Sequence, residues 1–437
     1  MSQTPRVYSD DGRAGARGDL PPILLADATW YGTLAAVRDL GAHGVPIVLA
    51  SDKTVAPARW SRFTKRTVRC PSTKDPNRFL EWLLAFGEAE PGHVYYPTSD
   101  SSAWLASVNR ELLAHRFKLF SPSASALSPL LDKAQLTAEA QRAGLDVPDT
   151  WYPKDEGEVE RIAGELTYPL VVKPRSQVFK VGGLKGDRIH RREDLVSMWR
   201  KHVSRRPGGS DGLPEVDVPI LQRCYPTSER IYTVDGFIDE TGEIFATLGC
   251  TKLLQLPRNS GSGLVFEESP VRASVDEGLR RLLKRVGFYG VFDAEFLEEG
   301  DRLLLIDVNP RIYNHMDFEV KRGLPLAWLA YLGAVGARDA LKAALETGSE
   351  LRAGSGRAYV HRLPTRLLLL CQRLSGGMSN AELKEWKCWL DAHSTARADP
   401  TRWPRDPGPA VADVVYHLQQ LCRHPRNFLR GYWRNAS

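Results

Sequence analysis

An α/β fold is predicted by the order of apolar runs and helix signals along the chain. Residues 23–25 are an apolar run, a helical stretch follows from about Trp30 to Leu40, and residues 46–50 are expected to form a second strand. This order indicates a βαβ unit and hence a parallel sheet. Farther along, alternating segments around short turns, at residues 230–248 and 289–308, predict two antiparallel hairpins. The middle of the chain is therefore expected to be α+β.

A small open α/β domain is expected over residues 20–125. Residues 94–96 are strand-like, and Ser99 or Asp100 is placed to cap the helix that follows. Residues 118–120 are expected to form the next strand. The region has no GxGxxG segment, so no dinucleotide fingerprint is predicted.

The bulk composition is neither membrane-like nor that of a disordered chain. The 437 residues exceed one ordinary domain, and 42% hydrophobic with 26% charged residues is typical of globular proteins. No apolar run approaches the roughly 20 residues that span a bilayer. Residues 1–19 lack the apolar core of a signal peptide and are expected to form a flexible leader. The six cysteines include no CxxC pair, which predicts neither a zinc site nor a disulfide framework and favours a cytoplasmic location.

The positive charge belongs to the end of the chain. The net charge is +6, and from Arg338 onward there are 16 Lys and Arg against 9 Asp and Glu. The rest is therefore about neutral, and no nucleic-acid-binding core is expected. Residues 336–437 are expected to form a basic, mostly helical extension that carries several tryptophans. Its last helix, at residues 411–422, either contacts an anionic membrane surface or packs on the preceding domains.

Polar side chains follow the two strands of the second predicted hairpin. Because alternate side chains of a strand share a face, Glu295 is expected to lie across from Asp307 and Asn309. These hard oxygen ligands suit Mg²⁺, which takes its other ligands from phosphates and water. The plain alternative is that the carboxylates only face solvent.

The Asp-Ala-Glu-Phe strand at 293–296, followed by Ile-Asp-Val-Asn-Pro-Arg at 306–311, resembles the metal-binding hairpin of the ATP-grasp superfamily. The resemblance extends over residues 126–335 and implies two lobes that clasp Mg-ATP, with Mn²⁺ able to substitute. It implies nucleotide contacts at two lysines, a mobile phosphate loop, an interlobe segment beside adenine and an acidic ribose contact. In that order these residues are Lys133 and Lys173; Gly182, Gly183 and Lys185; Gln222, Cys224 and Tyr225; and Glu229.

The physical chemistry of the segments agrees with this resemblance. A triphosphate carries several negative charges, so lysines and a glycine-rich loop of free N–H groups are a suitable cradle. Residues 251–263 resemble a loop beside the acyl phosphate in ATP-grasp carboxylate–amine ligases. Lys252, Arg258 and Arg311 are then the expected catalytic cations.

The resemblance implies an enzyme that activates a carboxylate as an acyl phosphate, releases ADP and joins the acyl group to an amine. Both substrates are expected to be small molecules, and a homodimer is left open. Two departures from the common pattern are Asp307, where Glu is usual, and Arg223, where many members are acidic. They leave open a nucleotide-binding protein without ligase activity, as well as a carboxylase or kinase-like variant. Residues 313–316 either line the acceptor pocket or only pack, and His315 is assigned no role.

Overall fold

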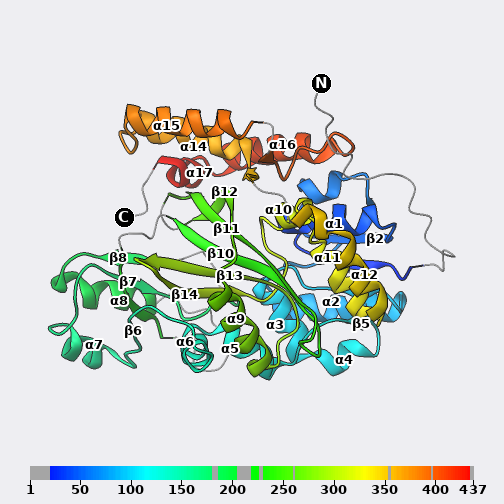
Figure 1. Ribbon diagram of the computed structural model, residues 1–437, viewed down its shortest axis with the longest axis horizontal. Helices are drawn as coiled ribbons and strands as arrows, with labels where there is room; N and C mark the ends of the chain where they lie inside the picture. Colours follow the sequence, from blue (N-terminus) through cyan, green and yellow to red (C-terminus); the bar gives the residue numbers. More distant parts are fainter. Residues whose placement is uncertain are drawn as a thin grey trace.

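The computed structural model describes residues 20–179, 186–203, 218–225, 230–258, 261–352, 356–394 and 397–433. Three sheets organise these residues, and Figure 1 shows the largest sheet in the centre with the C-terminal helices along one side. The predicted leader, residues 1–19, lies outside the described residues.

The first sheet is parallel and confirms the predicted βαβ unit. Its strand order is β3-β2-β1-β4-β5, and β1 pairs with both β2 and β4. The strands are β1 (Ile23–Leu25), β2 (Ile47–Ser51), β3 (Thr64–Arg69), β4 (Val94–Tyr95) and β5 (Lys118–Leu119). The associated helices are α1 (Tyr31–Ala42), η1 (Pro57–Trp60), α2 (Pro76–Ala89), α3 (Asp100–Val108) and α4 (Arg110–Ala114). The sequence did not predict β3, because this edge strand is polar and half-exposed and gives no apolar signal.

A small four-stranded sheet follows, in the order β6-β9-β7-β8. Two helices lead into it, α5 (Ala124–Leu131) and α6 (Lys133–Arg142). Its strands are β6 (Thr150–Trp151), β7 (Leu170–Lys173), β8 (Asp187–Ile189) and β9 (Ile220–Arg223). The helical segments α7 (Glu156–Ile162), η2 (Arg192–Asp194) and α8 (Leu195–Val203) belong to the same lobe, at the lower left of Figure 1. Apolar side chains of α7, α8, β7 and β9 share one core cluster, which holds this lobe together.

The central sheet has seven strands in the order β14-β13-β10-β11-β12-β15-β16. They are β10 (Ile231–Ile238), β11 (Phe245–Leu256), β12 (Ser262–Ser269), β13 (Gly290–Glu299), β14 (Arg302–Asn309), β15 (Ala358–Val360) and β16 (Arg397–Ala398). Both predicted hairpins are confirmed, as β10–β11 and β13–β14. Helix α9 (Ala273–Val286) buries Leu279, Leu282 and Leu283, spaced as one face of a helix requires.

One expectation about the central sheet was wrong. Residues 251–263 were expected to be a loop, yet β11 continues to Leu256 and β12 begins at Ser262. The run Thr251–Leu256 pairs with β12, so its backbone groups are satisfied by the sheet rather than by solvent. Lys252 therefore projects from a strand and has a fixed position.

The rest of the chain is helical apart from β15 and β16. Its helices are α10 (Asp317–Lys321), α11 (Leu326–Ala334), α12 (Arg338–Thr347), α13 (Ser349–Arg352), α14 (Arg362–Leu374), α15 (Asn380–Ala392), α16 (Gly408–Arg423) and α17 (Pro425–Trp433). The two strands make the extension part of the central sheet, which the sequence did not predict.

The C-terminal extension also packs on the N-terminal domain. The Arg38 guanidinium donates to Asp406 Oδ2 at 2.9 Å, and both side chains are buried. The Tyr31 hydroxyl donates to Asp413 Oδ1 at 2.7 Å. On the outer side, α16 leaves Val411 and Leu418 exposed, so contact with a lipid surface stays a prediction. Within the described ranges, no helix is long and apolar enough to cross a membrane.

Candidate active site

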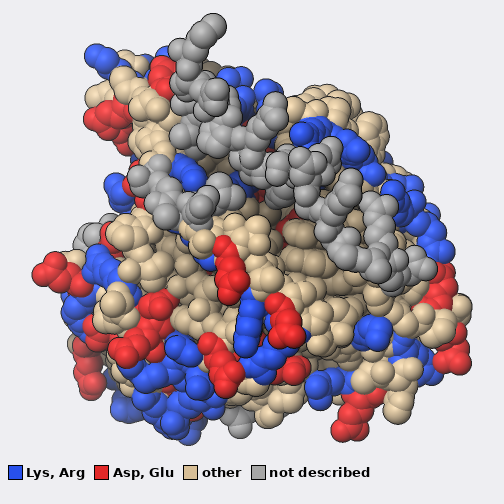
Figure 2. All heavy atoms as spheres, turned by 45° about the vertical axis from the view of Figure 1, so that its right-hand side comes forward, with Lys and Arg blue, Asp and Glu red and all other residues tan. Residues whose placement is uncertain are grey.

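A cavity of about 550 Å³ lies where the three sheets meet. The N-terminal domain lines it with residues such as Asp27 and Asp100, the small sheet with Lys173 and Gln222, and the central sheet with Glu295. On the face seen in Figure 2, acidic and basic side chains are interspersed over the described surface. The cavity is therefore identified as the candidate site by the residues that line it, and not by a surface patch of one charge.

The register of the β13–β14 hairpin sets the acidic side of the cavity. Glu295 lies opposite Asp307, and Asp293 lies opposite Asn309, as the alternation of the two strands predicts. A register shift follows directly after Glu295. The four side chains all line the cavity. They form a set of carboxylate and amide oxygens, which is the donor chemistry that Mg²⁺ prefers, so these residues fit the ion that the sequence predicts.

Two lysines reach the two carboxylates that were predicted to bind metal. Lys133 Nζ lies 2.6 Å from Asp307 Oδ1, and Lys252 Nζ lies 2.7 Å from Glu295 Oε1. Burial acts to lower the pKa of each lysine, but the facing carboxylate outweighs it, so the pKa of both lysines is raised. Both ammonium groups are therefore charged and in place before any ligand binds.

Helix α6 fixes Lys133 at its first position. Asp132 caps the helix by accepting from the backbone N–H of Ala134 at 3.0 Å. The same carboxylate accepts two hydrogen bonds from Arg175, at 2.5 and 2.7 Å. The Lys133 backbone N–H also donates to the carbonyl of Arg175 at 3.0 Å. This network ties α6 to the end of β7, next to Lys173.

Lys173 ends β7 and lines the same cavity. Burial, together with the nearby Lys133 ammonium, lowers the pKa of Lys173 to about 8. A bound anion would raise the pKa of Lys173 and so stabilise its charged form. It is a suitable contact for a polyphosphate.

Arg311 joins the N-terminal domain to the hairpin. Its Nε donates to Asp100 Oδ1 at 2.6 Å, and its Nη2 donates to Asn309 Oδ1 at 2.9 Å. The guanidinium carbon lies 5.7 Å from the centre of the Trp30 ring. Asn309 thus has its oxygen engaged by Arg311, while its Nδ2 donates to Asp293 Oδ2 at 3.0 Å. The second lone pair of Asn309 Oδ1 would serve a metal ion while Arg311 keeps its hydrogen bond.

The segment predicted to meet adenine lies at the end of β9. Gln222, Cys224 and Tyr225 all line the cavity, and the Gln222 amide donates to Thr150 Oγ1 at 3.0 Å. The Arg223 guanidinium, one of the departures noted above, lies 5.2 Å from the Tyr225 ring centre and pairs with Asp149. Gly182, Gly183, Lys185 and Glu229 lie outside the described residues.

Arg258 is not among the cavity-lining residues of the described chain. Its guanidinium donates to the carbonyl of Gly377 at 2.7 Å and to Glu382 Oε1 at 3.0 Å, both in the C-terminal extension. The structure thus brings together Lys252 and Arg311 but turns Arg258 toward the extension. The sequence could not anticipate this, because the partners lie more than 100 residues away.

Residues 313–315 line the cavity, and Tyr313 and His315 are also buried, whereas their part in an acceptor pocket stays a prediction. His315 stacks on Phe266 with ring centres 4.1 Å apart, and its Nε2 lies 3.2 Å from Asp235 Oδ2. Burial lowers the pKa of His315 to about 4, so the imidazole is neutral at neutral pH.

Sequence reasoning missed several residues that line the cavity. Asp27 ends β1, Asp100 begins α3 after β4, and Arg188 lies in β8. In the parallel sheet, β1 has β2 on one side and β4 on the other, so its carboxyl end is the switch point at which such sheets place ligands. That strand order would have pointed to Asp27 and Asp100, but the positions of the strands along the sequence do not reveal which strands are neighbours in the sheet.

The comparisons with known proteins agree with this geometry. No family model matches the sequence. The carbamoyl phosphate synthase large chain of Rubrobacter xylanophilus is 24% identical over 225 residues, which are 51% of this chain and 20% of that protein. The biotin carboxylase of Campylobacter jejuni has a TM-score of 0.56 at 18% identity, covering 71% of this chain and 70% of that chain. The L-amino acid ligase of Bacillus licheniformis has a TM-score of 0.55 at 15% identity, covering 78% and 79%.

The chain therefore has the ATP-grasp fold. Among ATP-grasp proteins it resembles the carboxylate–amine ligase-like members. It spans about a fifth of the length of the curated relative named above, so the activity of that whole enzyme does not transfer to it directly.

Proposed function

We propose that this protein is an ATP-dependent ligase that activates a carboxylate as an acyl phosphate, releases ADP and joins the acyl group to an amine. The observation that carries the proposal is the convergence of Lys133, Lys173, Lys252 and Arg311 on the Glu295–Asp307 pair in one cavity. A site that only held a nucleotide would not need Lys252 and Arg311 in addition to Lys133 and Lys173.

The nucleotide side of the cavity is formed by the small sheet and α6. Lys133 and Lys173 neutralise the triphosphate, and Gln222, Cys224 and Tyr225 at the end of β9 face the base. Glu295 and Asp307 would hold Mg²⁺, which supplies charge neutralisation for the phosphates. When ATP binds, the Lys133 ammonium can exchange its contact with Asp307 for contact with phosphate oxygens.

The first chemical step transfers the γ-phosphoryl group. A carboxylate oxygen of the acid attacks the γ-phosphorus, the bond from phosphorus to the β,γ-bridging oxygen breaks, and ADP leaves with its electrons. Such a reaction needs positioning and charge stabilisation more than covalent catalysis. Lys252 and Arg311 are placed to stabilise the negative charge on the transferring group, because they are buried and held by Glu295 and Asp100.

The second step forms the amide. The amine nitrogen attacks the acyl carbon, inorganic phosphate leaves, and the nitrogen loses a proton. The cavity wall formed by Asp27, Asp100 and residues 313–315 is the side on which the amine is expected to bind. Carboxylates suit an ammonium group there, and Asp27 already accepts from Thr73 and Thr98 at 2.8 and 3.1 Å, which fixes its orientation.

The acid and the amine are small molecules, and the relatives suggest where to search. A structural relative in complex with MgADP also contains bicarbonate, and another is an L-amino acid ligase. Bicarbonate and amino acids are therefore the first acids to test.

The test is product analysis with purified protein, Mg-ATP and a panel of these acids against ammonium and amino acids. Release of ADP and phosphate that depends on both acid and amine supports the proposal. Release of AMP and pyrophosphate overturns it. Glu295→Gln, which keeps the side-chain volume and removes the charge, serves as the inactive control. Nucleotide binding without turnover across the panel favours a non-ligating protein.

A further inference from the structure

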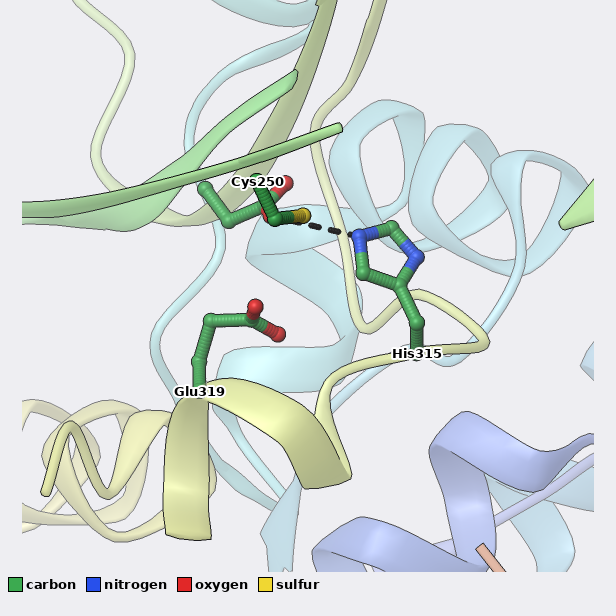
Figure 3. A group of neighbouring side chains, drawn as sticks. Cys250, His315 and Glu319 are labelled. Atoms are coloured by element: carbon green, nitrogen blue, oxygen red, sulfur yellow. Dashed lines mark hydrogen bonds and ion pairs between the residues drawn. The ribbon is translucent and has the colours of Figure 1, made fainter. Parts of the chain in front are cut away.

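A second cluster of side chains adjoins the cavity, which His315 lines, and includes Asp235, the strand partner of Asp293. It consists of Asp235 on β10, Cys250 on β11, His315 in the segment after β14, and Glu319 on α10. All four are buried, and one nitrogen, sulfur or oxygen atom from each lies within 4.8 Å of the others. Figure 3 shows Cys250, His315 and Glu319 pointing toward one another from three different elements.

We propose that Asp235, Cys250, His315 and Glu319 bind a single divalent transition-metal ion, and the chemistry of the donors selects Zn²⁺. The ion anchors residues 313–315, which line the cavity, to the central sheet. The proposal does not depend on the ligase activity, because metal binding is measured without turnover.

The type and number of donors select the ion. One thiol, one imidazole and two carboxylates are each a donor type that binds Zn²⁺, and together they give the four ligands of a tetrahedral site. A thiolate and an imidazole are poor ligands for Mg²⁺, which prefers oxygen, so this cluster is distinct from the Glu295–Asp307 pair.

The distances are close to those that a bound ion requires. His315 Nε2 lies 3.2 Å and Cys250 Sγ 3.4 Å from Asp235 Oδ2. Donors about 2.0–2.3 Å from a tetrahedral Zn²⁺ are separated by about 3.3–3.5 Å. The widest separation in the cluster exceeds this by little more than about 1 Å, which small side-chain rotations close.

Buried carboxylate oxygens in the cluster lack hydrogen-bond donors. Among the described residues, Glu319 Oε1 accepts no hydrogen bond although its side chain is fully buried, and Asp235 Oδ1 has no donor apart from the carboxyl group of Asp293. Such oxygens carry a free-energy cost unless a proton or a cation meets them.

The charge around these oxygens is also unbalanced. Arg322 Nη1 lies 3.7 Å from Glu319 Oε1, but the same guanidinium donates to Glu268 at 3.2 Å. The buried Asp293 carboxyl group hydrogen-bonds to Asp235, which requires a proton on one of the two groups. A divalent cation would supply Glu319 with the positive charge that Arg322 offers only at 3.7 Å.

The surrounding hydrogen bonds orient the donors, as outer-sphere groups do in metal sites. The Tyr313 hydroxyl donates to Glu319 Oε2 at 3.0 Å, and the Thr233 hydroxyl donates to Asp235 Oδ2 at 3.1 Å. His315 lies two residues before α10 begins, and Glu319 lies within that helix. Since Tyr313 and His315 also line the cavity, an ion here would fix the wall on which we expect the amine to bind.

The test uses the untagged full chain, stripped of metal and then given Zn²⁺ or Co²⁺ in the presence of a competing chelator. We expect one Zn²⁺ per chain after gel filtration and, with Co²⁺, the thiolate-to-cobalt absorption of a tetrahedral site. Cys250→Ser should abolish the absorption and lower the affinity for Zn²⁺ by about 100-fold or more. His315→Gln should weaken binding in the same direction.

The matched control is Cys70→Ser, which alters another buried cysteine that is not in the cluster and should leave metal binding unchanged. Glu295→Gln should also leave Zn²⁺ binding unchanged, which separates this site from the Mg-ATP site. Absence of stoichiometric metal in the wild-type protein overturns the proposal, even if a variant fails to fold. Equal Co²⁺ spectra in wild type and folded Cys250→Ser would overturn it as well.

Discussion

Lys133 Nζ and Asp307 Oδ1 lie 2.6 Å apart, so a predicted triphosphate contact and a predicted metal ligand neutralise each other within the protein. The same arrangement recurs between Lys252 and Glu295 at 2.7 Å. Before nucleotide binds, these ion pairs hold the central sheet against α6 and hold β11 against β13. Binding of Mg-ATP must therefore replace these internal ion pairs with contacts to the nucleotide and the metal ion. Each predicted contact of a lysine or arginine can be tested by replacing the carboxylate that pairs with it.

Replacing Asp307 tests the metal side of this exchange. Asp307→Asn should lower ATP turnover by about 10²–10³-fold, since it removes a charged ligand of the ion. It should also lower the melting temperature without nucleotide, because buried Lys133 loses its partner. Asp307→Glu, which adds one methylene and keeps the charge, should retain Mg²⁺-dependent turnover. Steady-state kinetics at varied Mg²⁺ measure both, and an unimpaired Asp307→Asn would exclude Asp307 as a ligand.

The lowered pKa of Lys173 predicts a pH dependence of nucleotide binding. Since its pKa in the folded protein is about 8, the ammonium is lost as the pH rises through that value, and affinity for ATP should fall there. Binding below this pH should be nearly constant, and binding near pH 8 should take up protons. Calorimetry in two buffers of different ionisation enthalpy measures that uptake. Lys173→Arg, which stays charged, should abolish both effects; an unchanged pH profile in this variant would contradict the assignment.

The lowered pKa of Lys173 also predicts that stability rises with pH, whereas affinity for ATP falls. Between about pH 8 and the ordinary lysine value of 10.5, the unfolded chain binds more protons than the folded protein at this position. The contribution of Lys173 to the free energy of unfolding should therefore increase with pH in that window, and Lys173→Met should remove this contribution. Urea titrations at several pH values compare the two proteins.

The contact between Arg311 and Asp100 predicts that the N-terminal domain acts in catalysis. Asp100→Asn keeps the shape of the side chain but weakens its hold on the Arg311 guanidinium, now 2.6 Å away. We expect kcat to fall by about 10-fold or more while the Kd for ATP changes little, because Arg311 acts on the transferring group. Loss of ATP affinity with unchanged kcat would mean that Arg311 contributes to nucleotide binding and not to phosphoryl transfer.

Arg258 provides the contrast to Arg311. Since its guanidinium contacts Gly377 and Glu382, Arg258→Ala should cost about 1–2 kcal/mol of stability and leave ATP turnover near that of the wild type. Thermal unfolding and kinetics measured on one preparation check this. A folded Arg258→Ala protein with kcat reduced by orders of magnitude would restore Arg258 to the catalytic set.

The sequence predicted the parts of this site that depend on local alternation. Facing positions such as Glu295 and Asp307 follow from the period of two in a hairpin. The contacts of the Arg258 side chain could not be predicted, because its partners Gly377 and Glu382 lie in the C-terminal extension, far along the chain. The same holds for Cys250 and Asp235, which meet only once β10 and β11 pair in their actual register.

The measurement that decides whether Glu295 and Asp307 hold the ion is a crystal structure with Mn²⁺ and a non-hydrolysable ATP analogue, recorded at a wavelength where manganese scatters anomalously. We predict a manganese peak about 2.0–2.2 Å from oxygens of both carboxylates, with Lys133 and Lys173 on the phosphates. A manganese peak elsewhere, or phosphates bound away from these two lysines, would contradict the assignment of this cavity as the Mg-ATP site.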